Sequence, residues 1–254
     1  MKVVFIGAGN VATHLSAAMR QAGLCICQIY SRTEKNAQRL AAEHACAWTT
    51  DTGALRSDAD LYVFALKDAV LHKIVTQVSP NEGLWLHTAG SVPMDIFRGY
   101  ARRYGVLYPL QTFSKKRPVD FRNVPCFIEA DSAQSEQRLR TLAEKISSDV
   151  RLLSFEKRRY LHLAAVFACN FTNHMYVLAD RILSEQGIDP AVLLPLIDET
   201  ATKIHTLSPA DAQTGPAVRY DCNVIEQQSA MLTDPVVREL YELISKNIHL
   251  LSQS

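Results

Sequence analysis

The stretch KVVFIGAGNVA, residues 2–12, decides the fold of this chain. Its first part, Lys2–Ile6, is an apolar run that predicts a short buried strand. The turn GAGN follows, and apolar residues then recur at helical spacing as far as Gln21. A strand, a tight turn and a helix in this order indicate the opening unit of an α/β sheet.

The turn fits the pattern G-x-G-x-x-G/A of loops that hold the diphosphate of a dinucleotide. Gly7 would allow the tight turn, Gly9 would let a diphosphate approach the backbone, and Ala12 would let the helix pack closely. The free N–H groups and the positive end of the helix dipole would face the ligand. We therefore predict a cofactor site at Gly7, Ala8, Gly9, Asn10, Val11 and Ala12. The alternative is an α/β domain that keeps the turn without the ligand.

The end of the second predicted strand, Ile26–Tyr30, indicates which dinucleotide is bound. Enzymes that use NAD usually place an acidic residue there, which binds the ribose hydroxyls. This chain has Ser31, Arg32 and Thr33 instead. A guanidinium with two neighbouring hydroxyls suits a 2′-phosphate, so these residues predict NADP rather than NAD. The alternative for Arg32 is a solvated surface arginine.

The first half of the chain alternates between strands and helices, and the second half does not. Further strands are predicted at 61–66, 84–87, 105–108, 125–129 and 150–153, with helices at 34–43, 70–78 and 133–147. This alternation indicates parallel pairing with helices on both faces. Beyond Ser154 the pattern predicts helices alone, at 156–186, 190–207 and 235–251. We predict an α/β protein with a doubly wound Rossmann-like parallel sheet in residues 1–154 and an all-helical second domain in residues 155–254.

Polar groups follow three of the predicted strands, at the edge where ligands bind in doubly wound sheets. The residues predicted to contact the cofactor there are Ala65, Leu66, Lys67, His87, Thr88 and Ala89, and Gln111 is predicted to bind substrate. His87 could donate to the nicotinamide ribose or to substrate, or it could be a satisfied structural histidine. Lys67 fits a surface lysine better than a catalytic base.

Polar residues interrupt an apolar face of the predicted helix 156–186. At about 100° per residue, His162, Cys169 and Asn173 fall within about 40° of one another, and Asn170 lies beside them. Buried polar groups need partners, so such a stripe marks a site or a specific contact between helices. We predict catalytic roles for His162 and Asn170 and substrate binding by Asn173, with helix-to-helix hydrogen bonds as the alternative.

The segment TGPAVRYD, residues 214–221, joins two predicted helices. Arg219 could hold a substrate carboxylate or phosphate in a bidentate clamp, with Asp221 orienting it. The alternative is a structural Arg–Asp pair that pins the loop.

The overall composition excludes several classes of partner. The net charge is +1, so no global field favours nucleic acid or an anionic membrane. No apolar stretch reaches the roughly 18 to 20 residues that a membrane span needs. The chain has six cysteines without a CxxC pair or a disulfide-framework pattern. These features predict a cytoplasmic protein without a metal site, whose partner is a small-molecule substrate.

Four stretches together resemble a family of bacterial proteins: HTAGS (87–91), YPLQTFS (108–114), HLAAVFACNFTNHM (162–175) and TGPAVRYD (214–221). Its members join a Rossmann-like NADP-binding domain to a helical domain of unknown function. They are related to pyrroline-5-carboxylate reductase, ketopantoate reductase and the β-hydroxyacid dehydrogenases. The resemblance covers nearly the whole chain and implies NADP binding and a homodimer formed through the helical half.

One departure from the β-hydroxyacid dehydrogenases concerns catalysis. Those enzymes carry a catalytic lysine one helical turn before the helix asparagine. If Asn170 is that asparagine, Val166 stands at the lysine position. His162, one turn earlier, is a substitute acid or base, since imidazole changes protonation state near neutral pH.

These features together predict an NADP(H)-dependent oxidoreductase that reduces a small keto, imino or related acid by hydride transfer. The absent lysine supports a second interpretation, a sensor that binds NADP(H) without turnover. A binding module for another nucleotide is a third. The sequence does not name the substrate.

Overall fold

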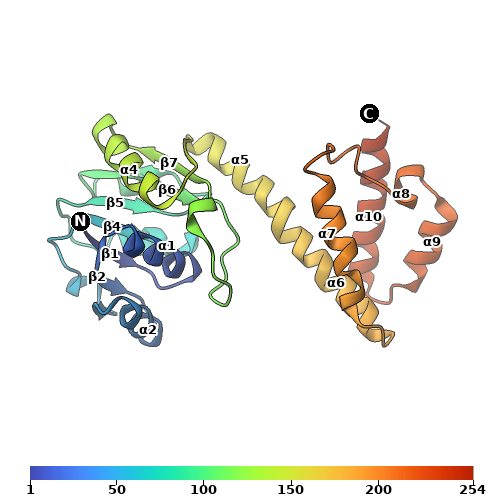
Figure 1. Ribbon diagram of the computed structural model, residues 1–254, viewed down its shortest axis with the longest axis horizontal. Coiled ribbons are helices and arrows are strands. Elements are labelled where there is room, and N and C mark those ends of the chain that lie inside the picture. The colour runs from blue at the N-terminus through green and yellow to red at the C-terminus, as the bar shows by residue number, and fades with distance from the viewer. Residues whose placement is uncertain (254) are drawn as a thin grey trace. The chain divides into compact units, whose positions relative to one another are not determined.

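The computed structural model describes residues 1–253 (Figure 1). The chain divides into two compact units, and the division falls between Cys169 and Asn170. The first unit carries the sheet and the second consists of helices. The domain division between residues 154 and 155 stays a prediction. The helix that begins at Phe155 belongs, up to Cys169, to the first compact unit.

The first unit is built on an eight-stranded sheet with the order β3-β2-β1-β4-β5-β6-β7-β8. Its strands are β1 Lys2–Ile6, β2 Cys25–Tyr30, β3 Ala47–Thr49, β4 Leu61–Phe64, β5 Leu84–His87, β6 Arg103–Pro109, β7 Cys126–Ala130 and β8 Val150–Leu152. The doubly wound sheet is confirmed, and β3 is an addition that the sequence did not predict. The order reverses between β1 and β4, the switch point where such sheets bind ligands.

One pair of strands departs from the predicted parallel arrangement. β6 and β7 run antiparallel, with Gly105 opposite Ala130 and Pro109 opposite Cys126. A parallel pair needs a crossover, usually helical. Between these two strands the chain forms only a short 3-10 turn, η3 Phe121–Asn123, so it returns in the opposite direction.

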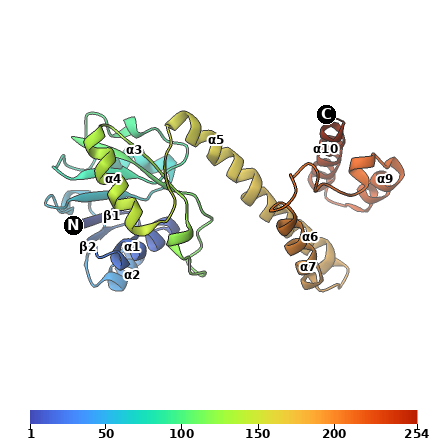
Figure 2. The same cartoon turned by 45° about the horizontal axis from the view of Figure 1, so that its top comes forward.

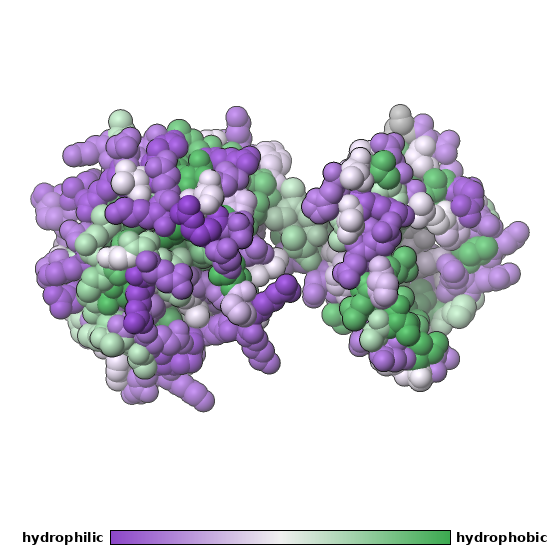
Figure 3. Space-filling model, in the orientation of Figure 1, coloured by the Kyte–Doolittle hydropathy of each residue, from purple (hydrophilic) through white to green (hydrophobic). Residues whose placement is uncertain are grey.

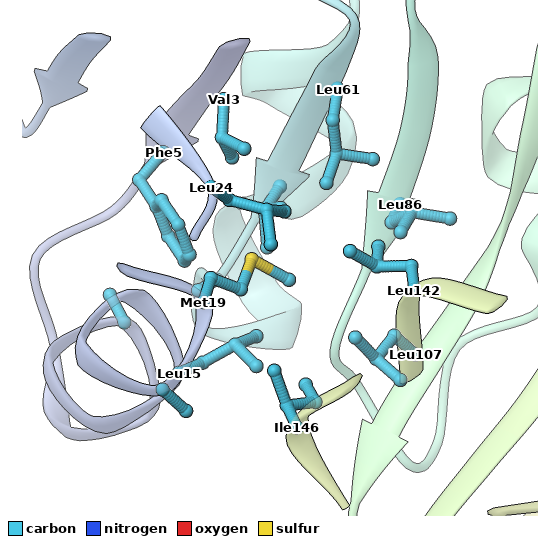
Figure 4. Close-up of a cluster of buried hydrophobic side chains, with 14 of the residues drawn as sticks. Val3, Phe5, Leu15, Met19, Leu24, Leu61, Leu86, Leu107, Leu142 and Ile146 are labelled. Carbon is cyan, nitrogen blue, oxygen red and sulfur yellow. The ribbon is translucent and has the colours of Figure 1, made fainter. Parts of the chain in front are cut away.

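Helices cover both faces of the sheet. α1 Asn10–Gln21, α2 Glu34–His44 and α4 Ala133–Ile146 pack on one face, and α3 Asp68–Val75 packs on the other. Figures 1 and 2 show α1 and α4 side by side on their face. The core there joins Leu15 and Met19 of α1 and Leu142 of α4 to alternate residues of the strands (Figure 4). This packing places the carboxyl ends of β1, β2, β4, β5 and β6 along one edge.

The predicted long helix at 156–186 consists of three parts. α5 Phe155–Ala165 is followed by the π-helical segment η4 Val166–Phe171 and by α6 Thr172–Glu185. A π-helix has wider turns than an α-helix. The shared face calculated at α-helical spacing for His162, Cys169 and Asn173 is therefore wrong, because the π-helical segment lies between His162 and Asn173 and contains Cys169.

The second unit is all-helical, as predicted. After α6 it contains η5 Pro190–Leu193, α7 Leu194–Lys203, α8 Pro216–Arg219, α9 Cys222–Met231 and α10 Pro235–Ser252. The sequence did not predict α8 or α9. Up to residue 253, this unit buries only Ala217, Ser229 and Ser245. Throughout residues 1–253, the helices fall short of the length and apolar character that crossing a membrane requires.

Candidate active site

The turn after β1 requires glycine at its first position. Gly7 is buried and has a φ angle of +123°, which disfavours other residues. A Cβ atom at Gly7 would lie 2.2 Å from the carbonyl oxygen of Ala65. The turn therefore lies directly against the chain that leaves β4, and the protein itself explains this glycine.

The second glycine of the turn has no such explanation within the protein. Gly9 is exposed, its φ angle of −83° suits any residue, and a Cβ atom there would meet nothing within 4 Å. Gly9 is also the N-cap of α1, without a side-chain capping bond and without an acidic residue in the first turn. The open space and uncapped amides fit a diphosphate that approaches the backbone.

The remaining residues of the turn divide between packing and surface contacts. Ala8 and Ala12 are buried in the core between α1 and the sheet, and Val11 packs against the same core. Asn10 is exposed, and its side-chain amide donates to the carbonyl of Phe113 at 2.8 Å. The predicted role of Ala12, close packing of helix on strand, agrees with its complete burial.

The loop after β2 lies next to the turn. The N–H of Gly7 donates to the carbonyl of Tyr30 at 2.8 Å, which joins the ends of β1 and β2. The N–H of Thr33 donates to the hydroxyl of Ser31 at 3.2 Å. Arg32 is exposed and forms no hydrogen bond or ion pair with any residue from 1 to 253. An exposed guanidinium fits a phosphate ligand and a solvated surface arginine equally, so the contacts predicted for Ser31, Arg32 and Thr33 stay predictions.

The residues after β4 contact the turn from the other side. Ala65 is nearly buried, and its carbonyl closes the space beside Gly7. Leu66 packs on the core beneath this edge. Lys67 is exposed at the N-cap of α3, which agrees with a surface lysine. The cofactor contacts predicted for these three residues stay predictions.

His87 lies at the end of β5 and is fully buried beside Phe97. Its Nδ1 accepts the N–H of Ala89 at 3.2 Å. Burial first, and then the charge of Arg158, lower the pKa of His87 to about 3. The enclosed ring does not reach the surface, but it is not the fully satisfied histidine of the alternative, because its Nε2 atom has no hydrogen-bond partner among residues 1–253. Thr88 and Ala89 are also nearly buried, so contacts from this segment would involve the backbone.

The segment after β5 also receives His162 from α5. A Cβ atom at Gly90 would lie 2.7 Å from Cγ of His162, so only glycine permits this approach. Nδ1 of His162 is 3.0 Å from the hydroxyl of Tyr108, at the end of β6. Tyr108 is almost fully buried, and burial raises its pKa, which keeps it a neutral phenol. The fold thus pairs an imidazole with a phenol at the edge that carries the glycine turn.

A buried ion pair fixes α5 in this position. Nη1 of Arg158 is 2.5 Å from a carboxylate oxygen of Glu129 on β7, and Nη2 donates to the carbonyl of Val92 at 2.7 Å. The side chain of Arg158 is 1% exposed, so water does not compete for these bonds. Arg158 and His162 are one helical turn apart and share a face. The arginine therefore fixes the face that presents the histidine.

The sequence did not single out Tyr108, Arg158 or Glu129 as individual site residues. Tyr108 stood within the motif YPLQTFS at a strand end, and Arg158 stands one turn before His162. These two positions were the only signals in the sequence that either residue belongs to the site. The pairing itself is not local, because Tyr108 and His162 are 54 residues apart in the chain.

The predicted site residues of the second unit are at the surface. Asn170 and Asn173 are exposed, the first in η4 and the second in the first turn of α6. Arg219 is exposed at the end of α8. Asp221 caps α9 by accepting the N–H of Val224, and no Arg219–Asp221 ion pair forms among residues 1–253. In the first unit, exposed Gln111 accepts the N–H of Thr112 at 2.8 Å.

The fold and its glycine turn define a Rossmann-type protein with a helical second part. Residues 2–85 match the family described as NADP oxidoreductase coenzyme F420-dependent, and residues 124–248 match a domain of unknown function, DUF2520. No curated protein matches the chain.

Solved structures extend these matches over the whole chain. A Bacteroides fragilis protein, provisionally described as an NADP oxidoreductase, is 48% identical, covers 98% of this chain and 97% of its own, and has a TM-score of 0.92. This chain belongs to the same family, in which an NADP-binding Rossmann domain precedes the DUF2520 domain. The predicted family resemblance is confirmed, and so is NADP as the cofactor of the family.

More distant structures share the fold. A Thermotoga maritima protein is 23% identical with a TM-score of 0.79, and covers 99% of this chain and 100% of its own. The 1-pyrroline-5-carboxylate reductase of Streptococcus pyogenes is 14% identical with a TM-score of 0.66, covering 98% of each chain.

Proposed function

We propose that this chain is an NADP(H)-dependent reductase that transfers a hydride to the C=O or C=N carbon of a small keto or imino acid. The observation that carries the proposal is the glycine turn between β1 and α1, where Gly9 is exposed and the first amides of α1 have no side-chain cap. Membership of the family supports the cofactor. The distant similarity to a reductase of a cyclic imino acid suggests the substrate class.

The residues around the turn would hold the cofactor. The uncapped amides that open α1 would bind the diphosphate, and Arg32 would bind the 2′-phosphate with Ser31 and Thr33. Within residues 1–253, no carboxylate pairs with Arg32, and no acidic residue stands in the first turn of α1. The buried ring of His87 is left out of this set.

When bound, NADPH supplies the hydride. We assign His162 as the donor of the proton that the reduced heteroatom takes up. The protonated imidazole would release the proton from its Nε2 atom, and the Nδ1–H that the neutral ring keeps would donate to the hydroxyl oxygen of Tyr108. The raised pKa of Tyr108 keeps that hydroxyl protonated. Solvent would then protonate His162 again, which balances one hydride and one proton per substrate.

The roles of the second unit remain part of the proposal. Arg219, whose guanidinium has no partner among residues 1–253, would bind a substrate carboxylate, and Asn170, Asn173 and Gln111 would offer amide groups to substrate. The orienting role predicted for Asp221 is not retained, since its carboxylate caps α9. The cytoplasmic location stays a prediction.

We also propose that two copies associate through the helical unit, because this unit buries almost no side chains of its own. Large apolar residues are exposed on its helices, among them Leu196 of α7 (62%) and Leu243 of α10 (63%). Figure 3 shows hydrophobic side chains on the surface of this unit. An apolar cavity of about 410 Å³ lies between α6 and α10, lined by residues that include Ile182 and Ile244. A second copy of the same helices would cover these surfaces, and a monomer by light scattering at micromolar concentration would refute this.

Turnover is tested by the loss of NADPH absorbance with a panel of 2-keto acids and cyclic imino acids. We expect activity with at least one class, and loss of about 100-fold or more in a His162→Gln variant that still binds NADPH. His72→Gln, an exposed histidine on α3, is the control and should keep full activity. NADPH binding without turnover on any member would instead favour the sensor.

A further inference from the structure

The loop after β6 packs onto the first turn of α1. The carbonyl of Phe113 accepts from Asn10, and the carbonyl of Ser114 is 2.9 Å from Nε2 of His14. The rings of Phe113 and His14 stack with their centres 5.3 Å apart. These contacts hold the loop beside the uncapped end of the helix.

The next residue, Lys115, reaches the glycine turn itself. Its ammonium group donates to the carbonyl of Ala8 at 3.0 Å. The amide plane that carries this carbonyl leads directly into Gly9. The ammonium keeps two further N–H donors beyond this bond. Lys115 is exposed, and this hydrogen bond places its ammonium on the glycine turn.

Two charged residues of α2 act on the ammonium of Lys115, the cation Arg39 and the anion Glu43, and they are paired with each other at 2.5 Å. Lys115 itself has no ion pair with any residue from 1 to 253. Burial first, and then Arg39, lower the pKa of Lys115. An anion that binds beside Lys115 would offset both effects and stabilise the charged ammonium.

We propose that Lys115 binds the diphosphate of the cofactor and that residues 113–115 form a clamp on the β6 side of the glycine turn. This inference rests on the proposed NADP(H) site. It assigns the diphosphate charge to Lys115, as distinct from the 2′-phosphate charge on Arg32. Arg39 is the weaker candidate because its charge is already paired with Glu43.

The test compares Lys115→Met with Lys116→Met, the exposed neighbour, using NADPH fluorescence titrations. We expect Lys115→Met to weaken NADPH binding about tenfold or more, and Lys116→Met to change it less than about twofold. Lys115→Arg should retain most of the affinity, since it keeps the charge. Equal affinities for wild type and Lys115→Met would overturn the inference, while an absence of NADPH binding by the wild type would refute the proposed function itself.

A second ligand identifies the phosphate that Lys115 contacts. Adenosine 2′-monophosphate carries the 2′-phosphate without the diphosphate, so its affinity should be unchanged in Lys115→Met and reduced in Arg32→Ala. If Lys115→Met weakens adenosine 2′-monophosphate as much as NADPH, the diphosphate assignment is wrong. Thermal unfolding without ligand should give the same midpoint for Lys115→Met and Lys116→Met, which shows that both variants fold.

Discussion

At the scale of single residues, the two glycines of the turn serve different purposes. Gly7 is required by its positive φ angle and by the carbonyl of Ala65, whereas Gly9 has open space where a Cβ atom would lie. The sequence pattern predicted both roles, because each depends on the local turn that the pattern encodes. The sequence could not show that His87 is buried, since its burial depends on Phe97 and other residues distant in the chain.

Substitution of each glycine by alanine separates these purposes. We expect Gly9→Ala to keep the wild-type unfolding midpoint but to weaken NADPH binding about tenfold or more, since a methyl group would occupy the diphosphate space. Gly7→Ala should lower the unfolding midpoint, because alanine is strained at this φ angle and would collide with Ala65. Differential scanning fluorimetry with and without NADPH measures both effects. Unchanged NADPH binding by Gly9→Ala would contradict the site.

His87 should make stability depend on pH. Its pKa is about 3 in the folded protein and about 6.5 in an unfolded chain, so the unfolded state binds the proton first. This contribution is complete above about pH 6.5 and is lost as pH falls towards about 3, at up to about 1.4 kcal/mol per pH unit. Urea unfolding at several pH values should show a shallower acid loss in His87→Gln than in wild type. The exposed control His72→Gln should follow wild type, and identical slopes in all three proteins would refute the assignment.

At the scale of the elements, α5 is fixed to the sheet by the Arg158–Glu129 pair. The sequence predicted the helix from its periodicity, but it could not predict the pair, because β7 and α5 meet only after the sheet has formed. The π-helical η4 and the antiparallel β6–β7 pair escaped prediction for the same reason. Both depend on packing and on connection geometry rather than on local residue preferences.

Breaking the Arg158–Glu129 pair tests its importance for stability. Arg158→Met leaves the Glu129 carboxylate uncompensated in a largely buried place and should lower the free energy of unfolding by about 3–5 kcal/mol. The control is Arg151→Met, which removes an exposed pair with Asp149 and should cost no more than about 1 kcal/mol. The double variant Arg158→Met/Glu129→Leu should recover part of the loss. Equal costs for Arg158→Met and Arg151→Met in urea unfolding would show that the buried pair has no special role.

At the scale of the whole molecule, the two compact units differ in how they are stabilised. The first unit has a continuous core on both faces of its sheet, and its architecture was predictable because strand and helix patterns alternate clearly. The second unit exposes large apolar side chains on most of its helices, and sequence alone could not show this. Its proposed association with a second copy follows from that exposure.

The central claim is that the glycine turn and Arg32 together bind NADP(H). The most direct test is the affinity of wild type and Arg32→Ala for NADPH and NADH, with Lys35→Ala on α2 as an exposed control. We predict that wild type prefers NADPH by about tenfold or more and that Arg32→Ala loses this preference through weaker NADPH binding alone. Lys35→Ala should retain the preference. Equal losses for both cofactors in Arg32→Ala, or no binding of either by wild type, would contradict the account.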